Sequence, residues 1–213
     1  MVVMNDQRVA LRGVAWGTYL RLAEEVGDCA TLMAFNRGVL ELMSQGMRHE
    51  RVKKRIDRLV ALVSEELDLP LMSFGSTRWL VSEAERGVEA DGCYMLTREK
   101  VEACRGRSRN VADYPFPDLV VEVDMSWSAV DREGIYGAMK VAEVWRFDEE
   151  VLHIERLKGD GTYDEVLESG FLGVKAEEVT RWLHEVGDAD DNAWARRLRG
   201  WVRGEVVGRR KKG

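Results

Sequence analysis

The sequence has few cysteines and no long apolar segment. Its three cysteines, Cys29, Cys93 and Cys104, are an odd number without a CxxC pair, which argues against a disulfide framework and a zinc knuckle. No apolar run is long enough to cross a bilayer. Asp6 and Arg8 interrupt the region where a signal peptide needs a continuous apolar stretch. We therefore expect reduced cysteines and a cytoplasmic protein without a membrane partner.

The sequence also lacks the short motifs of several enzyme classes. It has no GxSxG nucleophile elbow and no cysteine placed beside a histidine in a recognisable signature. It has neither a phosphate-cradling GxxxxGK[ST] loop nor a GxGxxG after a strand. Covalent hydrolases and nucleotide-dependent enzymes are therefore not supported.

An excess of positive charge is missing as well. The formal net charge is −6 and the isoelectric point is near 5.3, whereas phosphate contacts depend on Lys and Arg. Positive charge gathers locally in RHERVKKR at 48–55, CRGRSR at 104–109 and GRRKKG at 208–213. A solvated face, a loop and a chain end would also explain these segments. Composition therefore leaves a nucleic-acid partner open.

The length and composition suit one main domain with a short C-terminal addition. With 213 residues and 45% hydrophobic composition, the chain can bury one substantial core. We expect the main domain over 1–187 and the addition over 188–213. The addition contains NAWARRLRGWV, an amphipathic helix with Trp194, Leu198 and Trp201 on one side, followed by the basic tail.

Hydrophobic periodicity predicts the main secondary-structure elements. Apolar residues recur every three to four positions from Arg48 to Leu67, which predicts the clearest helix in the chain. Shorter helices are predicted over 18–26, 131–140 and 176–186. Extended segments are predicted over 35–44, 71–81, 141–147, 151–157 and 163–169. Residues 98–114 are rich in charge and are expected to form a mobile loop.

One segment places carboxylates at the spacing of a β-strand. It is PFPDLVVEVDMSWSAVDREGIY, residues 115–136. Side chains alternate between the two faces of a strand, so Asp118, Glu122 and Asp124 share one face. Burying several carboxylates is costly unless cations or hydrogen bonds compensate, and oxygen ligands suit Mg²⁺ or Mn²⁺. The pattern therefore predicts a divalent-metal site.

A second acidic segment, GVEADGCYML at 87–96, has strand character, with Glu89 and Asp91 expected on a common face. Together with FNRGVLELMS, RHERVKKRIDRLV, PDLVVEVDMS and DREGIYGAMKVAEVWRFD, it resembles the PD-(D/E)XK nuclease superfamily and, within it, the Uma-two family of bacterial restriction endonucleases. The resemblance covers residues 30–160. It implies an α+β, restriction-endonuclease-like fold, with a central mixed sheet of about five strands flanked by helices.

The resemblance also implies roles for individual residues. Asp91 corresponds to the metal-binding aspartate, Glu122 to the acid of the (D/E)XK strand, and Asp118 to an accessory acid. Asp124 stands where the motif has lysine, and the lysine that this family displaces onto the following helix corresponds to Arg132. Because arginine keeps its proton near neutral pH, Arg132 is expected to stabilise a metal-bound hydroxide or the phosphate rather than to act as a base.

The start of the long helix carries two further candidates, His49 and Glu50. The family has a histidine there, and a helix carboxylate near the metal is common in the superfamily, which makes Glu50 a candidate for an outer role. An ion pair with Lys54 would explain Glu50 equally well, and capping or packing would explain His49. We expect His153 and His184 to be structural.

The function that the resemblance implies is Mg²⁺- or Mn²⁺-dependent hydrolysis of DNA phosphodiester bonds. Asp91 and Glu122, with Asp118, would hold a metal that acidifies a water and polarises the phosphate. The alternative is a weak or inactive member that binds nucleic acid or protein. Arg132 in place of lysine, Ala90 in place of the usual proline before Asp91, and the acidic isoelectric point favour this alternative.

The sequence also suggests a homodimer, because a double-strand cut needs two active sites and a chain of this size supplies one. Trp182, Trp194 and Trp201 provide apolar surface in the C-terminal helices. These side chains are expected to pack either within the chain or against a second copy.

Overall fold

The computed structural model describes residues 6–27, 31–106, 111–185 and 190–210. Its strands are β1 (Gln7–Arg12), β2 (Thr31–Asn36), β3 (Val39–Ser44), β4 (Met72–Ser73), β5 (Arg78–Val81), β6 (Arg86–Glu89), β7 (Gly92–Met95), β8 (Leu119–Val123), β9 (Glu143–Phe147), β10 (Leu152–Leu157) and β11 (Tyr163–Val166). Its α-helices are α1 (Trp16–Val26), α2 (Met47–Glu66), α3 (Arg98–Cys104), α4 (Arg132–Met139), α5 (Ala176–His184), α6 (Asp191–Trp201) and α7 (Val207–Arg210). Short helical turns are η1 (Ser82–Ala84), η2 (Val111–Asp113) and the π-helical η3 (Val202–Val206).

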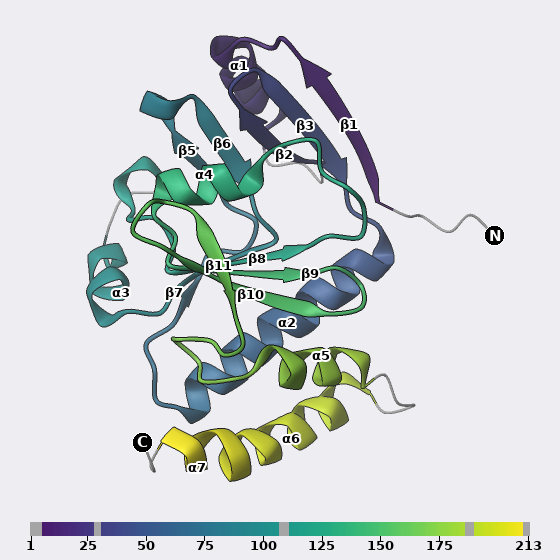
Figure 1. Cartoon of the computed structure of the whole chain (residues 1–213), viewed down its shortest axis with the longest axis vertical. Helices are drawn as coiled ribbons and strands as arrows, with labels where there is room; N and C mark the ends of the chain where they lie inside the picture. Colours follow the sequence, from purple (N-terminus) through teal and green to yellow (C-terminus); the bar gives the residue numbers. More distant parts are fainter. Residues whose placement is uncertain (1–5, 28–30, 107–110, 186–189, 211–213) are drawn as a thin grey trace, which may run out of the picture.

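The strands form two sheets, which Figure 1 shows one above the other. The first has the order β1-β3-β2-β6-β5 and the second β11-β10-β9-β8-β7-β4. The second sheet is mixed, because β8 and β9 run parallel while its other pairs are antiparallel. The expected α+β, restriction-endonuclease-like class is confirmed. The expected single sheet of about five strands is replaced by two, since the chain leaves one sheet after β6 and enters the other at β7.

The acidic strand β8 lies inside the second sheet, between β7 and β9. On one face Leu119, Val121 and Val123 join a core with α2, whereas Val120 faces a second core that includes Ile135 of α4. The alternation predicted from the sequence is therefore present. It directs the Glu122 side chain toward α4 and away from α2.

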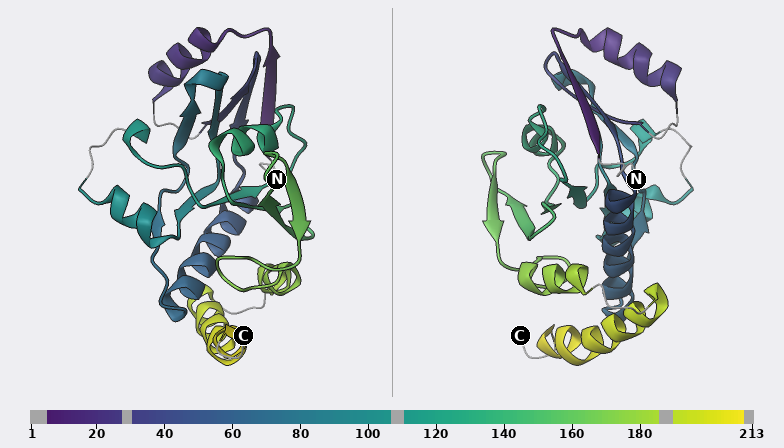
Figure 2. Two further views of the ribbon diagram at one scale, coloured as in Figure 1. Left: turned by 60° about the vertical axis from the view of Figure 1, so that its left-hand side comes forward. Right: turned by 90° about the vertical axis from the view of Figure 1, so that its right-hand side faces the viewer.

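The long helix α2 matches the predicted helix from Arg48 to Leu67 and runs along the second sheet to the C-terminal helices (Figure 2). Its residues Ile56, Leu59, Val60 and Val63 are fully buried. They share one core with α5 and α6. Because the same helix begins beside the acidic strands, it connects that part of the molecule to the C-terminal end.

The C-terminal tryptophans pack within the chain. Trp182 and Trp194 are buried and Trp201 is partly buried, all in the core shared with α2. The Trp194 indole N–H donates to the carbonyl of Trp182 at 3.0 Å. These side chains therefore serve the core of one chain.

Some elements differ from the predicted ones. The predicted loop over 98–114 contains α3 and η2, and its residues 107–110 lie outside the described residues. Strand β1 was not predicted, because five of its six residues are exposed and its sequence QRVALR gives no clear alternation. Residues 211–213 of the basic tail, and Cys29, also lie outside the described residues. None of the described helices is both long and apolar enough to span a membrane.

The packing of α6 predicts a large effect of one substitution. Trp194→Ala should lower the free energy of unfolding by about 3–5 kcal/mol, because it leaves a cavity between α2 and α6. The matched control is Trp127→Ala, since Trp127 is 81% exposed and its loss should change stability by less than about 0.5 kcal/mol. Urea unfolding measures both. Equal unfolding midpoints would show that α6 is not part of the cooperative core.

Candidate active site

Asp91 and Glu122 lie opposite each other on neighbouring strands. Gly92 pairs with Val121 across the antiparallel strands β7 and β8, and the Asp91 N–H donates to the Val121 carbonyl at 3.1 Å. This register places Asp91 across from Glu122, with both side chains on the same face. Asp91 is 2% and Glu122 1% exposed. The two acids that the sequence singled out are therefore brought together and buried.

The Asp91 carboxylate is held from three sides. Its Oδ2 accepts a hydrogen bond from the Val123 amide at 2.7 Å. Its Oδ1 accepts one from the Gln45 side chain and lies 2.9 Å from His49 Nε2. Burial works to raise the pKa of Asp91, but the hydrogen bond and charge of His49 outweigh it, and the pKa is lowered. Asp91 is therefore an ionised, fixed carboxylate.

His49 links this carboxylate to a second one. The ring is fully buried, with Nδ1 2.6 Å from Asp6 Oδ2 and Nε2 against Asp91. Burial works to lower the pKa of His49, but the hydrogen bonds and charges of the two aspartates raise it above its ordinary value. Asp6 Oδ1 also accepts the Gly46 amide at 2.7 Å, just before α2 begins. His49 therefore bridges the two carboxylates and anchors α2 to the site.

Glu122 is paired with Arg132, the first residue of α4. Its Oε1 accepts from Arg132 Nη1 at 2.7 Å and from the Tyr136 hydroxyl. The pKa of Glu122 is raised, because burial and the charge of Asp91 outweigh Arg132. The pKa of Arg132 is raised well above its ordinary value, because the charge of Glu122 outweighs burial. The expectation that Arg132 reaches the acidic strand agrees with this geometry.

Glu41 of β3 was missed by sequence reasoning. Its Oε1 lies 3.3 Å from Arg132 Nη2 and accepts from Arg8 Nη1 at 2.8 Å. Its Oε2 accepts from the Ala129 amide at 2.8 Å. Burial works to raise the pKa of Glu41, but these hydrogen bonds and the guanidinium charges lower it. The signal was present, since Glu41 is a carboxylate in the otherwise apolar run VLELM.

Asp124 lies where the cluster meets solvent. Its side chain is 27% exposed and contacts Arg8 Nη2 at 3.2 Å. Arg146 approaches it at 3.8 Å but is already paired with Glu155 at 2.8 Å. A surface pocket of about 370 Å³ runs from Asp124 to Ser128 and includes the exposed Trp127. This pocket therefore opens to solvent beside Asp124.

The cluster holds more negative than positive charge. With every group ionised, four carboxylates face two guanidinium groups, namely Glu41, Asp91, Glu122 and Asp124 against Arg8 and Arg132. In this count, a protonated His49 ring balances Asp6. Two negative charges are thus left over, which is the charge that one divalent cation neutralises.

The structure does not bring Asp118 to this cluster. Its Oδ2 accepts from the Leu96 and Thr97 amides at 2.8 and 2.9 Å, and its Oδ1 pairs with Lys100 at 2.7 Å. Asp118 shares a face with Glu122, but four strand residues span about 13 Å. The expected convergence of three carboxylates is therefore wrong. Among the described residues, no group of three His, Cys, Asp or Glu side chains is arranged to hold a metal ion.

Two other expected placements also differ. Glu50 pairs with Lys53 at 3.0 Å and not with Lys54, and its side chain is 40% exposed. Glu89 ends β6 in the first sheet, where its carboxylate contacts Arg78 at 2.7 Å. It therefore does not share a face with Asp91, because the chain changes sheets between them.

Gln45 and Lys53 extend the site toward the surface of α2; Lys53 belongs to the basic segment 48–55, whereas Gln45 was not singled out from the sequence. The Gln45 amide group donates to Asp91, while its Oε1 accepts from Lys53 Nζ at 3.1 Å. The Gln45 side chain thus links Lys53 to Asp91. A relay of hydrogen bonds joins the buried acid to a cation that is 19% exposed.

Comparison with known proteins relates this geometry to one family. The family model Uma2, described as "Putative restriction endonuclease", matches residues 16–180. A crystal structure of "a putative nuclease belonging to DUF820" from Anabaena variabilis is similar with a TM-score of 0.52 at 12% sequence identity. The match covers 80% of this chain and 99% of that one. No curated protein matches the chain.

The contacts of Asp118 predict a pH-dependent contribution to stability. Asp118→Asn should lower the free energy of unfolding by about 2 kcal/mol at neutral pH, because charge-assisted hydrogen bonds are lost. Burial works to raise the pKa of Asp118, but Lys100 and the two amides outweigh it and lower the pKa below its ordinary 3.8. The contribution is therefore complete above that value and is lost as pH falls through the folded-state pKa.

Urea unfolding of both proteins between about pH 7 and about pH 3 measures this contribution. The stability difference should shrink at the acidic end. Glu83→Gln, on the exposed turn η1, is the control and should change stability by less than about 0.5 kcal/mol. A difference between wild type and Asp118→Asn that stays constant over the whole range would contradict the assignment.

Proposed function

The chain belongs to the Uma2 family, and from this premise we propose that it is a metal-dependent endonuclease that hydrolyses phosphodiester bonds of DNA. The observation that carries the proposal is the pair of buried acids, Asp91 and Glu122, side by side on adjacent strands with uncompensated negative charge around them. The family description and the nuclease-like fold support the same reaction class.

The donor set fits Mg²⁺ or Mn²⁺. Mg²⁺ is bound by one or two carboxylates and keeps several waters or takes substrate phosphate oxygens, so Asp91 and Glu122 can hold it without a third side chain. The pKa of Glu122 is raised first by burial and then by the negative charge of Asp91, and a cation bound between the two carboxylates would favour their charged forms. When bound, the metal supplies a more acidic water and a positive charge beside the phosphate.

The remaining residues of the cluster have separate tasks in this proposal. His49 and Gln45 fix the orientation of Asp91 through hydrogen bonds. Arg132 keeps a permanent positive charge against Glu122, and in this proposal that charge would stabilise the negative charge that develops on the phosphate. It cannot serve as the general base, since its pKa is raised even further by its partners.

A second function, binding of nucleic acid or protein without cleavage, is favoured by one observation. Arg132 already contacts Glu122 Oε1 and Glu41. The negative charge of these two carboxylates is therefore partly compensated without a metal. A cation bound at Glu122 would have to share the carboxylate with this guanidinium. DNA as the substrate, the cytoplasm as the location and pairing of two copies stay predictions in either case.

The first test of the proposal is metal-dependent cleavage. Purified protein with Mg²⁺ or Mn²⁺ should nick supercoiled DNA, and EDTA should abolish the activity. Asp91→Asn and Glu122→Gln should each lower the rate by at least about 100-fold, because loss of a ligand costs no less than loss of its supporting partner. Calorimetric titration with Mn²⁺ provides a readout without DNA. Cleavage by Glu122→Gln at the wild-type rate would identify a contaminant and favour the binding function.

A second test concerns Arg132. Arg132→Lys should keep cleavage within about 10-fold, because the positive charge remains while the forked contact to two carboxylates is lost. Arg132→Ala should abolish cleavage and lower the free energy of unfolding by about 3–5 kcal/mol, because Glu41 and Glu122 are left as unpaired buried charges. Rates are compared at a temperature where urea unfolding shows both variants folded. A folded alanine variant with full activity would remove Arg132 from the mechanism.

A further inference from the structure

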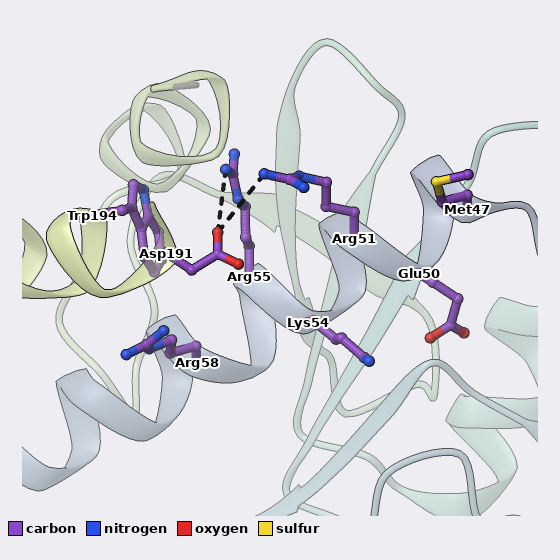
Figure 3. A pocket seen from close by; sticks show the side chains of 8 residues that line it. All are labelled: Met47, Glu50, Arg51, Lys54, Arg55, Arg58, Asp191 and Trp194. Atoms are coloured by element: carbon purple, nitrogen blue, oxygen red, sulfur yellow. Dashed lines mark ion pairs between the residues drawn. The ribbon is translucent and has the colours of Figure 1, made fainter. Parts of the chain in front are cut away.

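A basic groove lies between α2 and α6, outside the cluster of buried acids (Figure 3). Its volume is about 460 Å³. Helix α2 contributes most of the lining and α6 the opposite wall, the residues being Met47, Glu50, Arg51, Lys54, Arg55, Arg58, Asp191 and Trp194. We refer to this surface as the α2–α6 groove.

The α2–α6 groove is strongly positive within an acidic chain. Figure 3 shows Arg51 and Arg55 extending toward Asp191, at 3.9 and 3.6 Å. Lys54 is in no ion pair among the described residues, and Arg58 donates to the neutral side chain of Asn192 at 2.9 Å. Glu50 is taken by Lys53. Apart from Glu50, the only carboxylate among the described residues that line the groove is therefore that of Asp191, against four cationic side chains.

Among the described residues, the buried guanidinium of Arg55 is only partly satisfied. Its side chain is 9% exposed, and its Nε has no hydrogen-bond partner among the described residues. The contact to Asp191 is too long for a hydrogen bond, and Asp191 is itself 59% exposed. The guanidinium lies 5.9 Å from the centre of the Trp194 ring, which fixes its position. Unsatisfied buried donors are costly, and a planar guanidinium fork matches the oxygens of a phosphate.

The groove and the acids are joined through one helix. The first turn of α2 holds His49 against Asp91, and Glu50, which lines the groove, pairs with Lys53 beside Gln45. The rise from Arg51 to Arg58 is roughly 10 Å, so the cations of α2 are spread along the groove. Asp191 and Trp194 of α6 lie beyond the matched residues 16–180, whereas the α2 residues that line the groove lie within them.

We propose that the α2–α6 groove binds the phosphate backbone of DNA beside the bond to be cleaved. Arg55 is the central contact, and Lys54 and Arg58 bind the flanking phosphates. The inference rests on the proposed function, and it names the surface that would bind the DNA substrate. It also explains how a chain with a net charge of −6 holds a polyanion, since attraction depends on the local charge of the contact surface.

The test measures DNA binding apart from cleavage. Anisotropy of a fluorescent duplex in EDTA is titrated with the full chain and with Lys54→Gln/Arg58→Gln, two substitutions outside the buried core. The double variant should raise Kd roughly tenfold or more at about 0.1 M salt and lower the slope of log Kd against log salt by about two, because two phosphate contacts are lost. Arg55→Lys should weaken binding less, since it keeps the charge without the fork.

The matched control removes the same charge far from the groove. Arg12→Gln/Arg21→Gln alters exposed residues of β1 and α1, at the opposite end of the molecule (Figure 1), and should change Kd less than about twofold, because distant exposed charges are screened. If both double variants weakened DNA binding equally, the groove would not be the binding surface, while the proposed function would remain in place. A wild-type chain that binds no DNA at all would overturn the proposed function itself.

Discussion

The fold depends on the compensation of carboxylates that are buried where the two sheets meet. Glu41 belongs to the first sheet and Glu122 to the second, and the Arg132 guanidinium contacts both. A buried carboxylate without a partner costs several kcal/mol. Contact between the sheets and correct placement of α4 therefore depend on each other, while Arg8 of the first sheet supplies a second partner for Glu41.

The same requirement fixes the N-terminal part of the chain and the start of α2. Arg8 reaches Glu41 and Asp124 from β1, and Asp6 binds both His49 and the amide of Gly46. Segments that are more than a hundred residues apart thereby meet at one point, as the contact from Arg8 to Asp124 shows. Rigidity at this point serves chemistry as well, since fixed charges need no reorganisation during a reaction.

Sequence reasoning found the parts of this arrangement that are local. The periodicity of α2, the alternation along β8 and the position of Arg132 just after β8 depend on near neighbours, so they can be read from the chain. Alternation states which face a side chain occupies but not how far along the strand it lies, which explains the wrong placement of Asp118. Glu41, Arg8 and Gln45 were missed because long-range pairing of the two sheets brings them to the site.

Helix α2 contributes residues to both the buried acids and the α2–α6 groove, so it sets the distance between these two surfaces. The helix carries His49 near its start and Arg58 about two to three turns later, and its Ile56 and Leu59 pack in the core. The offset between the two surfaces is therefore set by the rise of the helix and cannot vary independently of the core. One residue inserted between them would turn the later side chains by about 100° relative to the earlier ones. The number of residues in this segment therefore determines both the separation and the relative orientation of the two surfaces.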